Sequence, residues 1–522
     1  ASGMDMQMEL ASSLVAAGTC HAARAKLDEA QSAFEQALQL SEGILPEIEW
    51  RSHIGLGDLA GSRSEFEIAL ASYRRAVDAF ARIRQNFWQP SLAGSYLQKP
   101  ARVFDRIIAF AARAKTAEDA LVFIESSKAS TLQGQLLSDH SHKLDVDSRE
   151  LSDLEAEIRF LQDRLRTPPE LSFPHRAGSE FRKVRAQLME KTRHYEALKE
   201  RLERKSEFKQ LSARAAGDGF HPDSFRAVAG RSLRENWIAL DYYLTDESII
   251  IVLLSPTRCE VFDAPIPYRL RMALEACQRA GRSPEPPTPA DLAVLGQALL
   301  PDSLAGELTP DTFLLLSPHR NLHAIPWAAL QPGFSSEPLA NLCAPAVIPS
   351  LQNLTVIWER RAVGLAPGRG NGLAVGLSTF DGKHRDLPQV RSGISFLMSK
   401  LGPAGACLAE EDATWKNILQ LAHGSAEGLS RFAWLHIASH FFSHPQTGRL
   451  SGLALRDGDV WLDELRDLAP LPGLVTIAAC NSISSFVYEG DEHVDLSSVC
   501  LAAGADSVVG SLWGVLDQAA AG

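Results

Sequence analysis

The stretch LVTIAACNSISS, residues 474–485, joins a β-branched apolar run to a cysteine and then to a polar segment without apolar periodicity. Val475, Thr476 and Ile477 favour a buried strand, and Cys480 follows where that strand is expected to end. The carboxyl edge of a parallel sheet is where α/β proteins place reactive side chains. A cysteine also packs as a small apolar residue. Cys480 is therefore either a nucleophile or part of the core, and a base elsewhere in the chain is needed to decide.

The histidines supply a candidate base. Of the 15 histidines, His436 and His440 lie on a strand-like run, WLHIASH, where the period of two puts both on one face. If this strand and the one before Cys480 are parallel neighbours, their ends lie about 5 Å apart. His440 then faces Cys480, and an imidazole there can take the thiol proton and later protonate a leaving amine. The pattern predicts a cysteine–histidine dyad; a structural histidine beside a core cysteine is the alternative.

The composition excludes several classes of protein. The 522 residues, 45% of them apolar and 22% charged, predict a globular chain of several domains. The net charge of −12 comes without a basic block, which argues against a nucleic-acid groove, and no apolar run approaches the length of a membrane span. Residues 1–10 lack the features of a signal peptide.

The seven cysteines are scattered and show no CxxC spacing. We therefore expect no disulfide framework, no metal site and no cofactor, and a reducing, cytoplasmic location. Cys500, on a helix-like stretch beside small residues, is expected to be core.

The first part of the chain repeats itself. Residues 18–38 align with residues 57–77, so that Gly18 matches Gly57 and Phe34 matches Tyr73. The spacing G-x11-A-x3-[FY]-x2-A is typical of a tetratricopeptide (TPR) helix pair, with a generic helical hairpin as the alternative. We expect TPR-like helical repeats over residues 1–137, which end in a further helix within residues 116–136.

Residues 138–215 are highly charged, with leucines at helical spacing on either side of Pro168 and Pro169. They predict an antiparallel helical hairpin, in the manner of a coiled coil, that serves as a spacer or docking arm.

From about residue 230 short β-rich runs alternate with amphipathic helices, which predicts an α/β fold with a largely parallel sheet. The runs include WIALDYYL, SIIIVLL, TFLLLSP, GLAVGLS, FAWLHIASHFF, GLVTIAACNS and ADSVVGSLW. The fold class is thus multidomain: an all-α N-terminal part and a C-terminal α/β part.

The segment from about residue 230 to 522 resembles the CHAT domain, a caspase-like family of cysteine peptidases related to separases. The motifs that carry the resemblance occur in the family's order: HRNLHAIPWAAL, AVIPSLQNL, DLPQVRSGISFL, EEDAT, LHIASHFF, SGLAL, LVTIAACNS and LAAGADSVVGSLWGVLD. TPR repeats commonly precede CHAT domains, and VFIESSKASTL resembles the helix that often links the two.

The resemblance implies a duplicated caspase-like domain. Residues 216–365 would form a half without its own dyad, in which His319 and His323 are structural. Residues 366–522 would form the catalytic half, with His440 and Cys480 as the dyad and the backbone N–H groups of Phe441 and Cys480 as the oxyanion donors. Family members usually have glycine where this chain has Phe441.

Two functions remain open at this stage. One is a cysteine endopeptidase that cleaves a protein substrate under the control of a partner bound to the TPR region. The resemblance implies a role in a bacterial defence system. In some members of the family the peptidase is switched on by a bound RNA-guided effector complex. The other is an inactive TPR-CHAT scaffold for protein–protein interactions, which Phe441 favours.

Asp517 lies just after the SVVGSLW run. The resemblance implies that this strand borders the S1 pocket, which binds the substrate residue before the cut, so Asp517 is a candidate anion for arginine or lysine. The alternative is that Asp517 is the N-cap of a following helix.

Overall fold

The structure of the protein is a computed structural model. It describes residues 2–85, 90–128, 220–280, 286–363, 372–401, 405–425, 427–442, 451–462, 464–483, 486–488 and 492–514, with single residues at 132, 136, 187, 190, 191 and 194. Nearly all of the hairpin expected at residues 138–215, and Asp517, lie outside these residues. No helix among the described residues is long and apolar enough to cross a bilayer.

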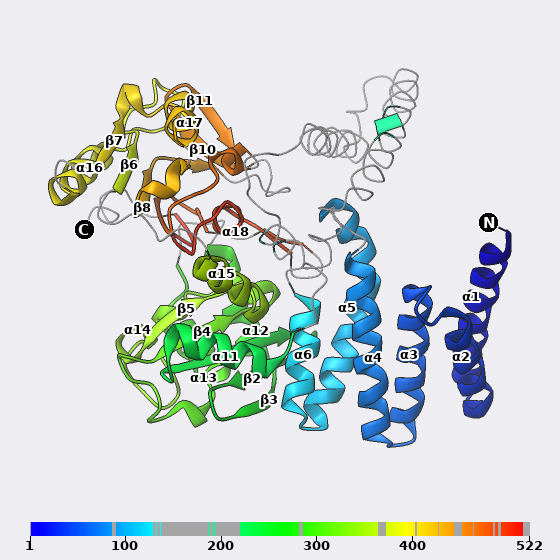
Figure 1. Ribbon diagram of the computed structural model, residues 1–522. Coiled ribbons are helices and arrows are strands. Elements are labelled where there is room, and N and C mark those ends of the chain that lie inside the picture. The colour runs from blue at the N-terminus through cyan, green and yellow to red at the C-terminus, as the bar shows by residue number, and fades with distance from the viewer. Residues whose placement is uncertain are drawn as a thin grey trace, which may run out of the picture.

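The N-terminal part is all helical, as expected, and its helices stand side by side (Figure 1). They are α1 (Ser2–Ala23), α2 (Leu27–Ser41), α3 (Pro46–Ser62), α4 (Phe66–Gln85), α5 (Pro90–Arg113) and α6 (Ala117–Ser127). In α2 the buried residues Ala30, Ala33, Phe34 and Ala37 recur at helical spacing, so one face of the helix packs inward.

The repeat read from the sequence recurs as a packing contact. A Cβ on Gly18 would lie 2.8 Å from the Phe34 ring, and a Cβ on Gly57 would lie 2.4 Å from the Tyr73 ring. Each glycine thus lets an aromatic ring of the paired helix approach its backbone. The first pair, α1 with α2, and the second, α3 with α4, are therefore packed in the same way.

The first sheet has the strand order β3-β2-β1-β4-β5. Its strands are β1 (Trp237–Leu244), β2 (Ser248–Leu254), β3 (Cys259–Pro265), β4 (Phe313–Ser317) and β5 (Ala344–Val347). β1, β4 and β5 run parallel, while β2 and β3 form an antiparallel extension. Every residue of β1 is buried, and apart from Asp241 its sequence is apolar throughout.

Helices cover both faces of this sheet. On one face the core continues from the sheet into α4, α5 and α6 and includes α11 (Pro222–Leu233). On the other face lie α12 (Tyr268–Ala280) and α13 (Pro289–Leu299). The helical region and the first sheet thus share one apolar core.

The second sheet is parallel throughout and has the order β15-β12-β8-β6-β7. Its strands are β6 (Gly372–Gly376), β7 (Ala406–Ala409), β8 (Trp434–Ala438), β12 (Leu474–Ala478) and β15 (Ser507–Val509). On one face pack α17 (Trp415–His423) and α18 (Leu496–Ala502), and on the other α16 (Pro388–Leu401) covers part of β6 and β8.

Shorter strands flank the second sheet. A small antiparallel sheet, β9 (Phe441–Phe442), β10 (Gly452–Leu455) and β11 (Gly458–Trp461), lies between β8 and β12 in the chain. The hairpin of β13 (Phe486–Tyr488) and β14 (Glu492–Val494) follows β12.

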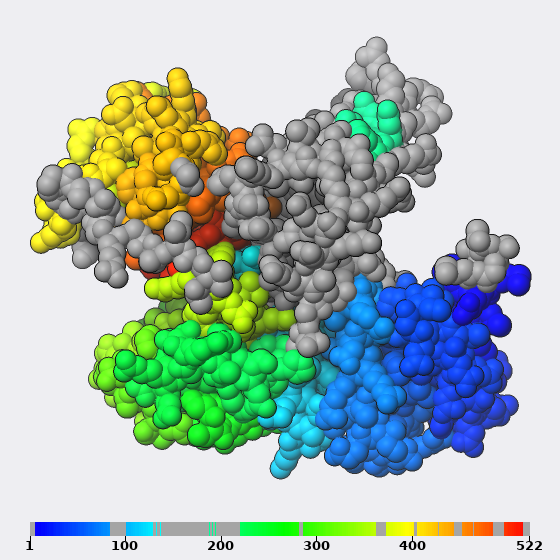
Figure 2. All heavy atoms as spheres, in the orientation of Figure 1, coloured from blue at the N-terminus to red at the C-terminus, as the bar shows by residue number. Residues whose placement is uncertain are grey.

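The helix α15 (Leu351–Val363) lies between the two α/β parts, with α14 (Leu339–Leu342) and β5 before it in the chain (Figure 1). In the space-filling view it is the yellow-green band between the green and the orange-red parts (Figure 2). The fold class expected from the sequence is confirmed, with one sheet mixed and the other parallel.

The glycine–aromatic contact generates the first testable prediction. Gly57→Ala is expected to lower the free energy of unfolding by about 1–3 kcal/mol, because it overpacks a filled site. The Tyr73 ring cannot move aside, since it is buried and its hydroxyl donates a 2.9 Å hydrogen bond to Asp58. Denaturant unfolding followed by the helical circular dichroism signal measures the change.

Gly230→Ala is the matched control. Gly230 is an exposed glycine of α11, and no atom lies within 4 Å of the place where its Cβ would be. Alanine there should raise stability by up to about 1 kcal/mol through its helix propensity. If both substitutions stabilise the protein equally, the close contact at Gly57 is wrong.

Candidate active site

The strands that end before His440 and Cys480 are parallel neighbours. β8 pairs with β12 from Trp434↔Leu474 to Ala438↔Ala478. His440 and Cys480 each follow the last paired residue by two positions, so the register brings them to the same point of the carboxyl edge. The expected adjacency of the two strands is confirmed.

The two residues also share a side of the sheet. His436 and Thr476 are partners in the register, and Nδ1 of His436 lies 2.8 Å from Oγ1 of Thr476. On the opposite face every second residue of each strand is buried, and this pattern extends beyond the strand ends to Ser439 and Ala479. His440 and Cys480 therefore keep the phase of His436 and Thr476.

The first sheet contains a comparable pair of strand ends. β1 and β4 are parallel, and their last paired residues are Asp241 and Ser317. Two positions further on, the rings of Tyr243 and His319 stack with their centroids 4.1 Å apart. Residues at this offset thus meet in the first sheet, where a tyrosine and a histidine take the places of His440 and Cys480.

His319 is buried, and its Nδ1 accepts a 2.9 Å hydrogen bond from the backbone N–H of Leu244. This is the structural environment that the sequence predicted for it.

A backbone carbonyl orients the His440 ring. Nε2 of His440 donates to the carbonyl oxygen of Arg385 at 2.6 Å. Because a carbonyl oxygen only accepts hydrogen bonds, Nε2 carries the proton, and in the neutral ring Nδ1 keeps its lone pair. His440 is thus held in the tautomer in which Nδ1 can accept a proton.

The loop after β6, residues 377–387, supplies this carbonyl and lies beside the ring. The Phe380 and His384 rings lie 4.7 and 5.4 Å from the His440 ring. The loop is closed by the Leu387 N–H, which donates to the carbonyl of Ser378 at 2.8 Å. It is tied to the end of β10 by a 2.8 Å ion pair between Asp381 and Arg456.

The chain turns sharply at Cys480. Asn481 has a φ of 57°, in the left-handed region that asparagine tolerates better than most residues. Its N–H donates to the carbonyl of Trp513 at 3.3 Å, and the N–H of Ile483 donates to the carbonyl of Ser511 at 3.2 Å. The N–H of Ser511 in turn donates to Oγ of Ser482 at 3.0 Å. The segment that follows β15 thus holds the turn that carries Cys480.

Four of the other cysteines are unsuited to nucleophilic chemistry. Burial raises the pKa of Cys259, Cys277 and Cys500 to about 12 and that of Cys343 to about 11. These four stay thiols near neutral pH and are poor nucleophiles. Cys480 is half-buried at a strand end, and Cys500 is core, as expected.

Phe441 has its side chain in the core of the second α/β part. The N–H of Ala454 donates to the carbonyl of His440, which makes Phe441 and Leu453 the next, non-hydrogen-bonded pair of the β9–β10 ladder. The N–H of Phe441 therefore points away from β10. Phe441 is not among the left-handed residues, so phenylalanine fits its backbone without strain.

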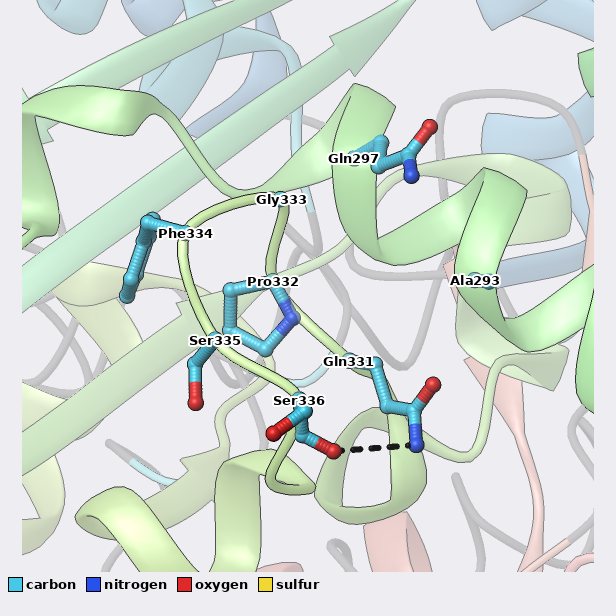
Figure 3. A pocket seen from close by; sticks show the side chains of 8 residues that line it. All are labelled: Ala293, Gln297, Gln331, Pro332, Gly333, Phe334, Ser335 and Ser336. Atoms are coloured by element: carbon cyan, nitrogen blue, oxygen red, sulfur yellow. Dashed lines mark hydrogen bonds between the residues drawn. The ribbon is translucent and has the colours of Figure 1, made fainter.

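A shallow cavity of about 390 Å³ lies elsewhere, in the first α/β part (Figure 3). Ala293 and Gln297 of α13 line it together with the loop of residues 331–336. It contains none of the residues predicted from the sequence.

Sequence reasoning singled out His440 and Cys480 as candidates but missed the groups around them. The Arg385 carbonyl and the turn at Asn481 are backbone features, which no residue pattern records. His384 lies in a loop without periodicity, and only its place in the fold brings it beside His440.

Residues 290–522 match the family model of the CHAT domain. Among solved structures, the chain is similar to a chain of the Saccharomyces cerevisiae separase–securin complex determined at 2.6 Å, with 11% identity and a TM-score of 0.38 over 99% of this chain and 50% of the other. The structure of that complex at 3.0 Å gives 11% identity and a TM-score of 0.39 over 95% and 49%. The chain spans about half the length of these separase–securin chains. No curated protein matches it.

His436 generates a prediction about pH. Burial lowers the pKa of His436 to about 4, so the folded protein keeps this ring neutral where an unfolded chain, with a pKa near 6.5, would take up a proton. Stability is therefore lost as the pH falls from about 6.5 to about 4. Between pH 7 and pH 5 the loss from this group is on the order of 2 kcal/mol.

To isolate this effect, the free energy of unfolding in urea is measured at pH 7 and pH 5 for the parent protein and for His436→Gln. Contributions of the other titrating groups cancel in the difference. The variant should lose less stability than the parent on acidification, and an equal loss would contradict the buried neutral ring.

Proposed function

We propose that this chain is a caspase-like cysteine endopeptidase with His440 and Cys480 as its dyad. The observation that carries the proposal is the parallel register of β8 and β12, which brings both residues to one point and one side of the sheet edge. The family match over residues 290–522 supports it independently, because it spans both strands.

In the proposed reaction the thiol of Cys480 gives its proton to Nδ1 of His440. The thiolate attacks the carbonyl carbon of the substrate peptide bond and forms a C–S bond. The imidazolium protonates the leaving amine, the C–N bond breaks, and a thioester remains on Cys480. Water then attacks the thioester carbon while His440 takes a proton, and the C–S bond breaks to restore the thiol.

The developing oxyanion needs donors near Cys480. We assign the backbone N–H groups of Phe441 and Cys480 to this role. The pairing of β9 with β10 supports Phe441, because its N–H is directed away from β10. The phenyl ring of Phe441 is buried, and the residue keeps its backbone N–H as a donor.

The helical region is assigned the recognition role. The glycine–aromatic contacts shared by the two helix pairs support TPR-like repeats, which bind partners on an extended surface. We propose a cytoplasmic peptidase whose activity is controlled by a protein partner bound there, such as an RNA-guided effector complex of a bacterial defence system. Its substrate is a protein.

A thiol-directed peptide probe tests the dyad. A peptidyl acyloxymethyl ketone should label Cys480 and no other cysteine, and Cys480→Ala should abolish the labelling. His440→Ala should slow labelling by about a hundredfold or more, because the thiol loses its base. Mass spectrometry of the digested chain identifies the labelled residue.

Cys407→Ala is the control, because Cys407 is exposed on β7 and lies away from the β8–β12 edge. It should leave the labelling unchanged. If His440→Ala is labelled as fast as the parent, the dyad is wrong. The second candidate, an inactive scaffold, is favoured by a phenylalanine where the family usually has glycine. Absence of labelling in the parent with its partner bound would support it.

For specificity we propose Asp517 as the S1 anion and cleavage after arginine or lysine. Fluorogenic peptides varied at the residue before the cut should show the basic preference. Asp517→Ser should weaken it by about thirtyfold or more, since a desolvated charge pair is lost.

Serine is chosen because it remains a good N-cap while it removes the charge. If Asp517 only caps a helix, Asp517→Ser keeps both specificity and stability, whereas Asp517→Ala loses about 1 kcal/mol of stability. That outcome would exclude the S1 assignment and leave the dyad intact.

A further inference from the structure

The helix α15 is held at its N-terminus by a carboxylate from the helical region. Glu125 of α6 is 1% exposed, and its two oxygens accept 2.8 Å hydrogen bonds from the backbone N–H groups of Leu351 and Gln352. The first N–H groups of a helix have no partner inside the helix, and a negative charge is favourable there. Glu125 thus fixes the start of α15 to the end of α6.

The end of α6 is itself fixed to the first sheet. Nζ of Lys128 lies 2.6 Å from Oδ1 of Asp241, and neither side chain has any exposed surface. The same Nζ donates to Oγ and to the carbonyl oxygen of Ser317 at 2.9 Å each. Asp241 and Ser317 are the last paired residues of β1 and β4, so α6 ends against the carboxyl edge of that sheet.

Near its C-terminus α15 holds the second α/β part. The guanidinium of Arg360 donates to the carbonyl of Leu501 at 3.0 Å and to that of Ala505 at 2.7 Å. It also lies 3.8 Å from the carboxylate of Asp506. Leu132 and Leu136, beyond α6, join Ile357 of α15 and Leu501 of α18 in one small apolar cluster. The helical region, α15 and α18 meet at this junction.

From this junction the contacts continue to Cys480. The N–H groups of Asp506 and Ser507 both donate to the carbonyl of Gly473, at 2.8 and 2.9 Å, just before β12 begins. β15 then pairs with β12, and the residues after β15 hold the Asn481 turn through Ser511 and Trp513. Every step from Glu125 to the turn is a direct hydrogen bond or a continuous stretch of chain.

We propose that α15 couples the last helix of the helical region to the turn that carries Cys480, so that a shift of α6 changes the reactivity of this thiol. The inference rests on the proposed function, since it names the regulation of that same site. Helices move as rigid bodies, and both ends of α15 are held by directional polar contacts that are made or broken rather than stretched. A partner on the helical region thus acts on the site through α6 and α15.

The test measures the rate at which iodoacetamide alkylates Cys480 in the full chain, resolved by mass spectrometry, in Glu125→Gln and Arg360→Met. Each should change the rate by about threefold to thirtyfold, and in the same direction, because each breaks one end of the same connection. The double variant should change the rate no more than the larger single variant, since contacts in series are not additive.

Two control variants change comparable groups away from α15. Glu49 is 3% exposed on α3 and accepts from the N–H of Gly43 at 2.7 Å. Arg431, just before β8, donates to the carbonyl of Leu421 at 2.8 Å. Glu49→Gln and Arg431→Met should leave the Cys480 rate within about twofold of the parent. The exposed Cys407 is the reference thiol in every digest and should not change.

Three outcomes would overturn the coupling. One is a Cys480 rate within about twofold of the parent in both variants, and another is strictly additive effects in the double variant. The third is simultaneous alkylation of the buried Cys277 and Cys500, which would mean general loosening of the fold. If Glu125→Gln does not fold, the comparison of Arg360→Lys with Arg360→Met decides. The lysine variant keeps a hydrogen-bond donor at this end of α15, so its Cys480 rate should be closer to that of the parent than the rate of the methionine variant.

Failure of this inference differs from failure of the proposed function. Alkylation does not require turnover, so the variants can alter Cys480 even if the chain cleaves no peptide. Conversely, labelling of Cys480 by the peptide probe that depends on His440, with no effect of the α15 variants, would leave the peptidase and remove the coupling.

Discussion

The parallel pairing of β8 with β12 is the constraint on which the site depends. It joins two residues that are 40 positions apart in the chain, and it does so only in the observed register. A shift of one residue would turn one of the two side chains to the other face of the sheet, because the side-chain period of a strand is two. Within the strands, His436 and Thr476 are partners in this register, and their side chains are in contact at 2.8 Å.

Backbone groups, more than side chains, complete the geometry around the two strand ends. The carbonyl of Arg385 orients the imidazole, and the carbonyls of Ser511 and Trp513 hold the turn after the cysteine. Arg456 reinforces one side of this arrangement, since it pairs with Asp381 and with Glu411 at 2.8 Å each. The backbone of Phe441 is not in the left-handed region, so its side chain adds no strain to this arrangement.

The helical region is attached to the α/β part by a shared core and by a buried ion pair. Removing one partner of a buried pair such as Lys128 and Asp241 typically costs about 3–5 kcal/mol, because the other charge is left without a partner. For Glu125, opposing effects act on the charge of the carboxyl group. Desolvation and the nearby Asp241 raise the pKa of Glu125, while Lys128 and the two N–H groups of α15 oppose that rise. The contact between α6 and α15 is therefore firm in geometry but sensitive to charge.

The sequence by itself determined the classes of structure and the chemistry-bearing residues. Helical spacing and the Gly–aromatic repeat predicted the N-terminal helix pairs, because close packing of two helices requires a small residue opposite each ring. Apolar runs predicted β1, β8 and β12, and the positions of His440 and Cys480 after two of them pointed to a thiol site. Only the tertiary structure decided the order of the strands, the tautomer of His440 and the junction at α15. These features depend on backbone carbonyls and on contacts between segments far apart in the chain, such as Glu125 with Leu351. A local pattern of residues does not specify which distant N–H group a carboxylate will contact.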